Sequence, residues 1–332
     1  KNTGSLATLI MVRPAEEIGA TFVHHANPLP PHLRISVVIP THNRPAFLAE
    51  ALASVMAQTM PPFEVIVVEN GSTPSTQAEL QKLVVQYPEI TLHHLSENLG
   101  CSAARNLGLD VATGDLIFFF DDDDLVAPTL FETALHHFCQ HPDSDALVVS
   151  YQNLIHHAEL DSPYFPTSLF DYRTKGPELE RNAFRVFLRS CPPIHSVVIR
   201  RQAIGDLRFV EHLEVGEDWL FWLQLARQNC HFAYCPQPLV YYRRHAGSKS
   251  HHQRYFFSEL EQFLTYLQTT SNLLESRHDR FFIESKLFFT CWSLRNPRFF
   301  WKGLRILMYP EWIVHYSLWL IATWMRRLTH GK

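Results

Sequence analysis

The chain has 332 residues, of which 46% are hydrophobic and 19% charged, with 12 glycines and 21 prolines. This composition excludes a disordered, collagen-like or low-complexity protein and predicts a folded chain. The length allows one large domain or a domain with a substantial appendage. Lys and Arg total 29 against 33 Asp and Glu, which gives a net charge of −4. Because no basic excess is present to neutralise a phosphate backbone, we expect no nucleic-acid partner.

The first 33 residues carry little periodic pattern, and their proline-rich end at 27–31 is typical of a linker. Nothing there has the charged, apolar and small-residue order of a signal peptide, so a cytoplasmic protein is the default expectation. The six cysteines are scattered without a C-x-x-C pair, which favours reduced thiols over disulfides or zinc ligands.

Residues 34–151 alternate short apolar runs with amphipathic stretches. The runs are rich in β-branched or aromatic residues, as expected of buried strands, and the stretches between them have helical spacing. Such alternation predicts an α/β fold with a mostly parallel, doubly wound, Rossmann-like sheet. The predicted strands are residues 35–39, 64–68, 90–95, 116–120 and 146–151, and the predicted helices are 45–58, 75–86, 102–111 and 128–138.

Residues 152–193 show no clear period and contain five prolines, so we expect loops and one short helix at 178–188. Regular structure is expected to resume with a strand at 194–200, a helix at 217–228 and a strand at 238–242. Everything from residue 253 onward is typical of helix. The predicted organisation is an extension at 1–33, a domain at 34–250 with halves 34–151 and 152–250, and a helical region at 251–332.

Polar clusters follow three of the predicted strands, at residues 40–44, 69–72 and 121–124. Because the carboxyl ends of parallel strands meet at one edge of a sheet, these clusters are expected to lie together where such sheets bind ligands. Four adjacent carboxylates repel one another unless a cation offsets them. Mn²⁺ or Mg²⁺ takes oxygen ligands and keeps positions open for phosphate. For an isolated acidic run, a solvated loop or a helix cap is the alternative interpretation.

The order and spacing of these clusters resemble the signatures of family 2 glycosyltransferases. The matching segments are residues 38–44, 67–72, 97–106 and 114–124. The resemblance covers residues 34–250 and implies the GT-A fold with a C-terminal helical extension. It also implies an inverting, metal-dependent enzyme that moves a single sugar from a nucleotide-sugar. A UDP-sugar is the expected donor, and Glu69 and Asn70 depart from the two aspartates that the family more often shows.

The resemblance further implies a role for each matching residue. Asp121 would face the ribose and Asp123 would hold the metal, Mn²⁺ or Mg²⁺, together with His245, while Asp124 is a further candidate. The residues implied in nucleotide-sugar binding are Pro40, Thr41, Arg44, Glu69, Asn70, Arg105, Asp121, Asp122 and Arg243.

Gly216-Glu217-Asp218 opens the predicted helix at 217–228 and resembles the family's Glu-Asp motif. Sugar transfer requires a stabilised diphosphate leaving group and a base that takes the acceptor's proton. The resemblance implies that Asp218 is this base and that Glu217 orients it or the acceptor. Acidic residues in a first helical turn also stabilise the helix dipole without any chemistry. The expected acceptor is a glycan, a lipid-linked sugar or a protein.

Other enzyme classes fit less well. No G-x-G-x-x-G follows the first strand and no G-x-x-x-x-G-K-[ST] loop occurs, which disfavours hydride transfer and P-loop hydrolysis. A sugar-phosphate nucleotidyltransferase needs a glycine-rich loop after the first strand, and residues 40–45 contain no glycine. A catalytically silent nucleotide-sugar or glycan-binding module of the same fold is the alternative from a different class.

Aromatic residues gather in the last third of the chain. The stretch 306–325 is interrupted by Pro310, Glu311 and His315, which disfavours a spanning helix. Its mixture of aromatic and basic residues is typical of a membrane–water boundary. Residues 298–328 are therefore expected to form an in-plane membrane helix, a packed core or a homodimer interface. The in-plane helix would make the protein peripheral on the inner face of a membrane.

Overall fold

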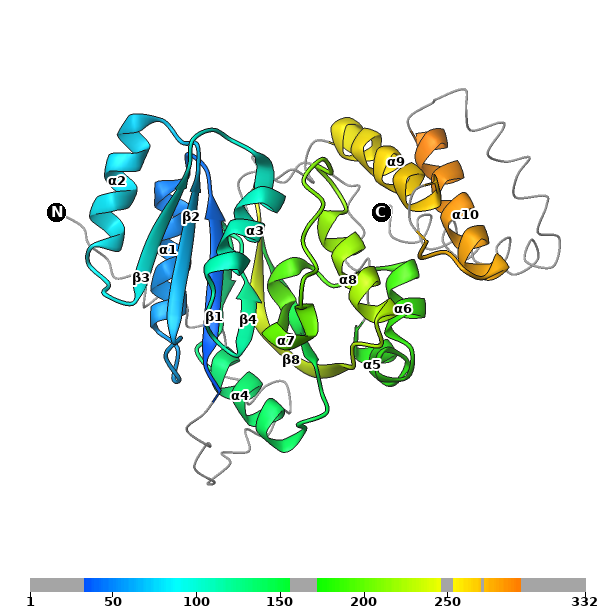
Figure 1. The fold of residues 1–332 in the computed structure, drawn as a ribbon, viewed down its shortest axis with the longest axis horizontal. Helices are drawn as coiled ribbons and strands as arrows, with labels where there is room; N and C mark the ends of the chain where they lie inside the picture. Colours follow the sequence, from blue (N-terminus) through cyan, green and yellow to red (C-terminus); the bar gives the residue numbers. More distant parts are fainter. Residues whose placement is uncertain (1–32, 156–171, 246–252, 270–271, 294–332) are drawn as a thin grey trace. The chain divides into compact units, whose positions relative to one another are not determined.

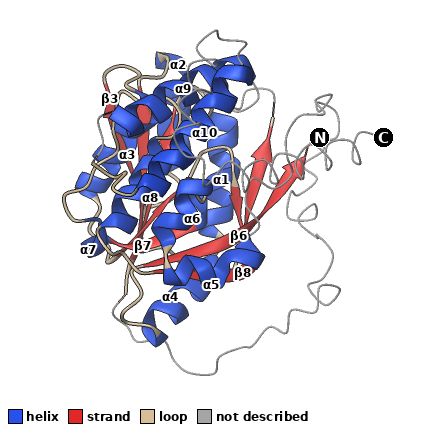
Figure 2. Ribbon diagram, turned by 90° about the vertical axis from the view of Figure 1, so that its right-hand side faces the viewer, coloured by secondary structure: helices blue, strands red, loops and turns tan. Residues whose placement is uncertain are grey.

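A computed structural model of the chain describes residues 33–155, 172–245, 253–269 and 272–293. Its centre is an eight-stranded sheet in the order β3-β2-β1-β4-β7-β6-β8-β5, and helices cover this sheet (Figures 1 and 2). The strands are β1 Ile35–Thr41, β2 Glu64–Asn70, β3 Ile90–Leu95, β4 Leu116–Phe119, β5 Leu125–Val126, β6 Ala146–Ile155, β7 Val197–Arg200 and β8 Phe232–Arg244.

Strands β1 to β4 form the parallel part of the sheet, with β1 paired to both β2 and β4. β1 and β4 are buried along their whole length, because helices cover both faces of the sheet here. Such strands have no solvent face and therefore consist of nearly continuous apolar residues. The parallel arrangement brings the carboxyl ends of β1, β2 and β4 to the same edge, as expected.

The rest of the sheet is mixed. β7 runs antiparallel between β4 and β6, and β5 runs antiparallel to β8, while β6 and β8 are parallel. The segment predicted as a strand at 194–200 begins with a 3-10 turn, Ile194–Ser196, before β7. Pro193 precedes this turn, and its carbonyl accepts hydrogen bonds from the amide and the hydroxyl of Ser196.

The helices follow the predicted order with three differences. Asn182 divides the helix expected at 178–188 into α5 and α6, and its side chain caps α6 by accepting from the amide of Arg185. Pro128 lies before α4 rather than in its first turn, and its carbonyl accepts from the amide of Thr59. The short elements β5 and α7 were not predicted. The helices are α1 Pro45–Met56, α2 Pro74–Val84, α3 Gly100–Val111, α4 Leu130–Gln140, α5 Tyr172–Arg181, α6 Ala183–Arg189, α7 Arg201–Ile204, α8 Glu217–Arg227, α9 Gln253–Thr269 and α10 Arg277–Ser293.

The two faces of β4 pack against different helices. Phe118 meets Phe131 of α4, with ring centroids 5.7 Å apart. Phe119 points to the opposite face, where it meets Phe221 of α8 at 6.0 Å. This second face carries the larger described core, to which α3, α6, α8 and α9 all contribute. The side-chain alternation along β4 thus places α8 on the same face as α3.

The C-terminal helices α9 and α10 lie side by side and pack against this core (Figure 1). Phe263, Leu264 and Leu267 of α9 are fully buried. From α8, Arg227 donates to the carbonyl of Leu273 and to Asp279. Among the described residues, no helix combines the length and the apolarity that crossing a bilayer requires. The segment 298–328, which we predicted to meet a membrane or a partner, lies outside the described residues, as does the extension at 1–32.

Candidate active site

Four aspartates, Asp121 to Asp124, follow β4 and form what we call the acidic run. The Thr41 hydroxyl at the end of β1 donates to Asp122 at 2.8 Å. Arg44 Nη1 lies 3.3 Å from Asp122 Oδ1 and 3.0 Å from Asp123 Oδ2. Burial and the neighbouring Asp123 raise the pKa of Asp122 to about 7. The first and third polar clusters of the sequence therefore meet, as predicted.

Arg243 lies at the end of β8, and His245 follows this strand. Both residues contact the acidic run. His245 Nε2 is 2.8 Å from Asp123 Oδ2, so the two predicted metal ligands are neighbours. The Arg243 guanidinium is 2.6 Å from Glu50 Oε2 and 5.2 Å from the ring centroid of Phe47. Arg243, predicted to contact the donor phosphates, directs its charge toward α1 in this structure.

His195 was not among the predicted site residues. The 3-10 turn before β7 places its imidazole, which is 1% exposed, 2.7 Å from Asp124 Oδ2 and 3.6 Å from Asp121 Oδ2. Burial opposes a charged imidazole, but the two carboxylates outweigh it and raise the pKa of His195 to about 10. The backbone amide of Arg243 donates to the other Asp124 oxygen at 2.8 Å. The available signal was the polar pair His195-Ser196 between Ile194 and the apolar residues of the buried strand β7.

Arg105 of α3 joins the acidic run to α8. Its Nη2 donates to Asp121 at 2.8 Å and its Nη1 donates to Glu217 at 3.0 Å, while its side chain is only 4% exposed. Burial favours a neutral Asp121, but the Arg105 guanidinium, with His195, holds the pKa of that carboxyl well below its usual range. The same carboxylates raise the pKa of Arg105. One buried cation thus connects the two predicted halves of the domain.

Asp218 lies in the first turn of α8, directly after Glu217. Gly216 is the N-cap residue directly before α8, and its φ of 84° lies in the left-handed region that favours glycine. Asp218 Oδ1 accepts from the backbone amide of Trp219 at 2.7 Å. Burial, followed by the charge of Glu217, raises the pKa of Asp218 to about 7. The carboxyl at this position therefore exchanges its proton near neutral pH.

Glu69 and Asn70 bind protein groups in this structure. Glu69 is fully buried and accepts from the amide of Ser72, from Gln77 and from His94, and these hydrogen bonds lower its pKa against the effect of burial. The Asn70 amide group donates to the side chain of Asn98 and to the Gly100 carbonyl, and its oxygen accepts from Leu99. Pro40 is buried in β1 opposite Val68. Together these residues shape the strand-end loops.

The donor atoms of the acidic run suit a divalent cation. Asp121, Asp124 and His195 each offer a ligand atom, and these atoms lie within 4.8 Å of one another. Among the described residues, Asp124 Oδ2 and both His195 nitrogens are buried without a well-oriented hydrogen bond. Asp123 and His245 supply a second oxygen–nitrogen pair nearby. The carboxylates suit Mn²⁺ or Mg²⁺. His195 could join them as a ligand only after losing the proton that Asp121 and Asp124 stabilise on it.

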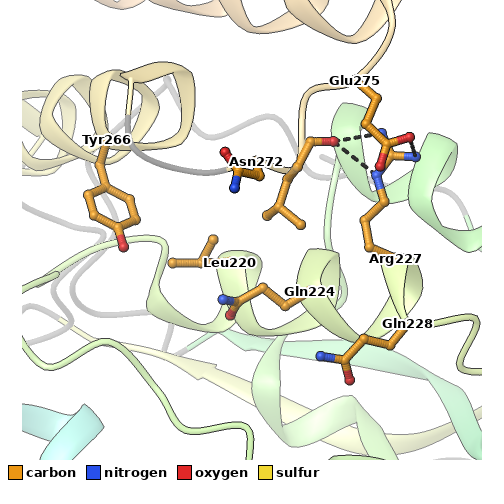
Figure 3. A pocket seen from close by; sticks show the side chains of 8 residues that line it. Leu220, Gln224, Arg227, Gln228, Tyr266, Asn272 and Glu275 are labelled. Carbon is orange, nitrogen blue, oxygen red and sulfur yellow. Dashed lines mark hydrogen bonds and ion pairs between the residues drawn. The ribbon is translucent and has the colours of Figure 1, made fainter.

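A pocket of about 390 Å³ lies apart from the acidic run, between α8 and the α9–α10 connection (Figure 3). Arg227 is held there by the Leu273 carbonyl and by Glu275 at 3.5 Å. None of the four aspartates lines this pocket. Its lining residues are Leu220, Gln224, Arg227, Gln228, Tyr266, Asn272, Leu273 and Glu275.

Comparison with known proteins identifies the class. The family described as Glycosyl transferase family 2 matches residues 36–208, which is more than half of the chain. The chain therefore belongs to glycosyl transferase family 2, in agreement with the expectation from its motifs.

Individual relatives are distant. The minor teichoic acid biosynthesis protein GgaB of Bacillus subtilis is 28% identical over 189 residues, which cover 55% of this chain and 20% of GgaB. This chain spans about a fifth to a third of the length of GgaB and of three related Rickettsia glycosyltransferases.

Solved structures support the fold. Residues 1–349 of S. aureus TarS in complex with UDP-GlcNAc align with a TM-score of 0.59 and 23% identity, covering 80% of this chain and 75% of that one. The mannosyltransferase PcManGT of Pyrobaculum calidifontis, in complex with GDP-Man and Mn²⁺, aligns with a TM-score of 0.57 and 16% identity, covering 90% and 81%. At these identities the likeness concerns the fold, and it confirms the GT-A prediction.

Proposed function

We propose that the chain is an inverting, metal-dependent glycosyltransferase that moves one sugar from a nucleoside diphosphate sugar to an acceptor hydroxyl. The observation that supports this most is the link made by Arg105. It ties the acidic run, suited to the donor diphosphate and its metal, to the helical turn that carries Asp218. Donor and acceptor chemistry must meet within a few ångströms, and this buried link holds the two parts together.

On the donor side, Asp123 and His245 are the proposed metal ligands, and Asp121 and Asp124 lie beside them. A bound Mn²⁺ or Mg²⁺ supplies Lewis-acid stabilisation for the charge that develops on the leaving diphosphate. Arg44 offers a further positive charge at the same edge. A UDP-sugar is the proposed donor, supported by the UDP-GlcNAc bound to the structurally similar TarS. Pro40, Thr41, Glu69 and Asn70 would shape the nucleotide pocket.

On the acceptor side, Asp218 is the proposed base. The acceptor oxygen attacks the anomeric carbon while the bond from this carbon to the diphosphate breaks, and the proton of the acceptor hydroxyl passes to Asp218. This single displacement inverts the configuration of the anomeric carbon. Efficient base catalysis needs a pKa close to the working pH, and the value of about 7 for Asp218 meets this requirement. Glu217, held by Arg105, is proposed to orient this turn.

The acceptor is proposed to be a glycan or a lipid-linked glycan, for which the name of the relative GgaB, a teichoic acid biosynthesis protein, gives support. Residues 298–328 are proposed to hold the enzyme at a membrane surface where such acceptors reside. A flotation assay with vesicles tests this point. Deletion of 298–328 should abolish co-flotation, and unchanged flotation would contradict it.

The experiment that tests the proposed activity begins with a thermal-shift screen of nucleotide-sugars in the presence of Mn²⁺. The stabilising donor is then used to measure sugar release and transfer by the wild type, by Asp218→Asn and by Asp110→Asn, a control at an exposed carboxylate of α3. We expect Mn²⁺-dependent turnover in the wild type and the control, with a loss in Asp218→Asn. A wild type that binds the nucleotide and releases no sugar would instead be the silent module.

A further inference from the structure

We infer that Phe263 of α9 is a positioning residue for Asp218. Through this residue, the C-terminal helix α9 contributes to the geometry of the transferase site. The inference rests on the proposed role of Asp218 as the base. It concerns how the chain holds that carboxyl in place, and it assigns a role to a helix beyond the segment that the family match covers.

The first contact joins Phe263 to Gly216. A Cβ atom at Gly216 would lie 2.6 Å from Cγ of the Phe263 ring and 2.7 and 2.9 Å from its two Cδ atoms. The ring therefore packs directly on the Cα of Gly216, the N-cap residue of α8. Glycine is required here twice, because φ is 84° and because the ring fills the space that a side chain would occupy.

The second contact joins Phe263 to Trp219, with ring centroids 5.3 Å apart. Trp219 is fixed further by α6 and α10. Its Nε1 donates to the Phe187 carbonyl at 2.5 Å, and Lys286 Nζ lies 4.8 Å from its ring centroid. Lys286 itself donates to the Arg189 carbonyl at 2.9 Å. An aromatic contact from α9, a cationic contact from α10 and a hydrogen bond to α6 thus converge on Trp219.

Asp218 lies between these two contacts. Phe263 touches Gly216, two residues before it, and Trp219, the residue after it, whose amide donates to the Asp218 carboxylate. Arg105 holds Glu217 from the side of the acidic run. The turn is therefore held by an ion pair on one side and by an aromatic ring on the other. Removing the ring frees the turn to move, and a displacement near 1 Å is enough to slow a reaction that depends on alignment.

The test compares Phe263→Ala with Leu267→Ala. Leu267 lies one turn later on α9 and is equally buried at 0% exposure, so both variants remove apolar contacts from the same core. At a temperature well below unfolding, we expect Phe263→Ala to lower kcat about 10- to 100-fold with a donor KM within about two-fold of wild type. Leu267→Ala should keep kcat near wild type, and Phe263→Leu should recover part of it.

Hydrogen exchange gives a readout that is independent of the reaction. Amides in residues 216–222 should exchange faster in Phe263→Ala than in Leu267→Ala, because only the first loses the ring on Gly216. Equal amide exchange in the two variants, or an equal loss of kcat, would mean that Phe263 contributes only to core packing. Either result would overturn the inference. If the wild type transfers no sugar, the proposed function fails, while the exchange comparison still decides whether Phe263 holds the turn.

Discussion

The site has a strand-end half, at the ends of β1 and β4, and a helical half, around Asp218 at the start of α8. Different kinds of contact hold the two halves in place. At the ends of β1 and β4, charged and polar side chains meet: Arg44 bridges two aspartates and His195 lies against Asp124. Around Asp218, the contacts are mostly aromatic, with Phe263 and Trp219 packed at the start of α8. The first half is therefore sensitive to charge and metal, and the second to shape. The predictions below separate these two sensitivities.

The largest effect is expected at Asp218. Asp218→Asn removes the proposed proton acceptor and should lower kcat about 10³-fold, within the range that positioned acid–base groups contribute. The asparagine keeps the shape of the side chain, so the KM for the nucleotide-sugar should stay within about two-fold. Steady-state kinetics with the donor found by the thermal screen measures both quantities. A kcat within three-fold of wild type would exclude Asp218 as the base.

Arg105 connects the two halves, and its removal should cost folding stability. Arg105→Met leaves Asp121 and Glu217, which are 29% and 14% exposed, without the buried cation that they share, so the free energy of unfolding should fall by about 3 kcal/mol. Urea denaturation followed by far-UV circular dichroism measures the change. Arg208→Met, which breaks the more exposed pair with Asp110, is the control and should change stability by less than about 1 kcal/mol. Equal losses in the two variants would contradict the special role of Arg105.

Asp123 tests the charge-based half. Asp123→Ala removes a proposed metal ligand and should lower kcat about 10²-fold, the loss typical when one group that stabilises leaving-group charge is deleted. The Mn²⁺ concentration that gives half-maximal activity should rise in parallel. Binding of Mn²⁺ followed by its electron paramagnetic resonance signal provides a readout apart from turnover. An unchanged Mn²⁺ affinity would place the metal on other ligands.

The smallest effect is a shift in pH dependence. A base must be unprotonated, so kcat should rise with pH as Asp218 loses its proton near pH 7. The negative charge of Glu217 disfavours ionisation of Asp218, and Glu217→Gln should move this limb to lower pH by less than about one unit. A pH–rate profile of both proteins measures the shift. A shift to higher pH would contradict the assigned coupling.

The sequence predicts the strand-end half well and the helical half only in part. The C-terminal ends of parallel strands lie at one edge of a sheet. The strand topology alone therefore predicts that Thr41, Arg44 and the acidic run lie close together. His195 was missed because its position depends on a 3-10 turn and on an antiparallel strand inserted beside β4. Phe263 was missed because its contact with Gly216 arises from packing between distant helices, for which periodicity indicates only a buried face.

The antiparallel insertion of β7 brings together segments that lie far apart in the chain. Leu116 of β4 pairs with Arg200 of β7, and Leu125 of β5 pairs with Tyr241 of β8. The chain between Leu116 and Arg200 and the chain between Leu125 and Tyr241 must each close into a loop before these strand pairs can form. Closing long loops slows folding. During synthesis, the four aspartates therefore emerge well ahead of His195 and the Arg243 amide that receive Asp124. Until those residues arrive, Asp124 lacks the partners that it has in the folded chain.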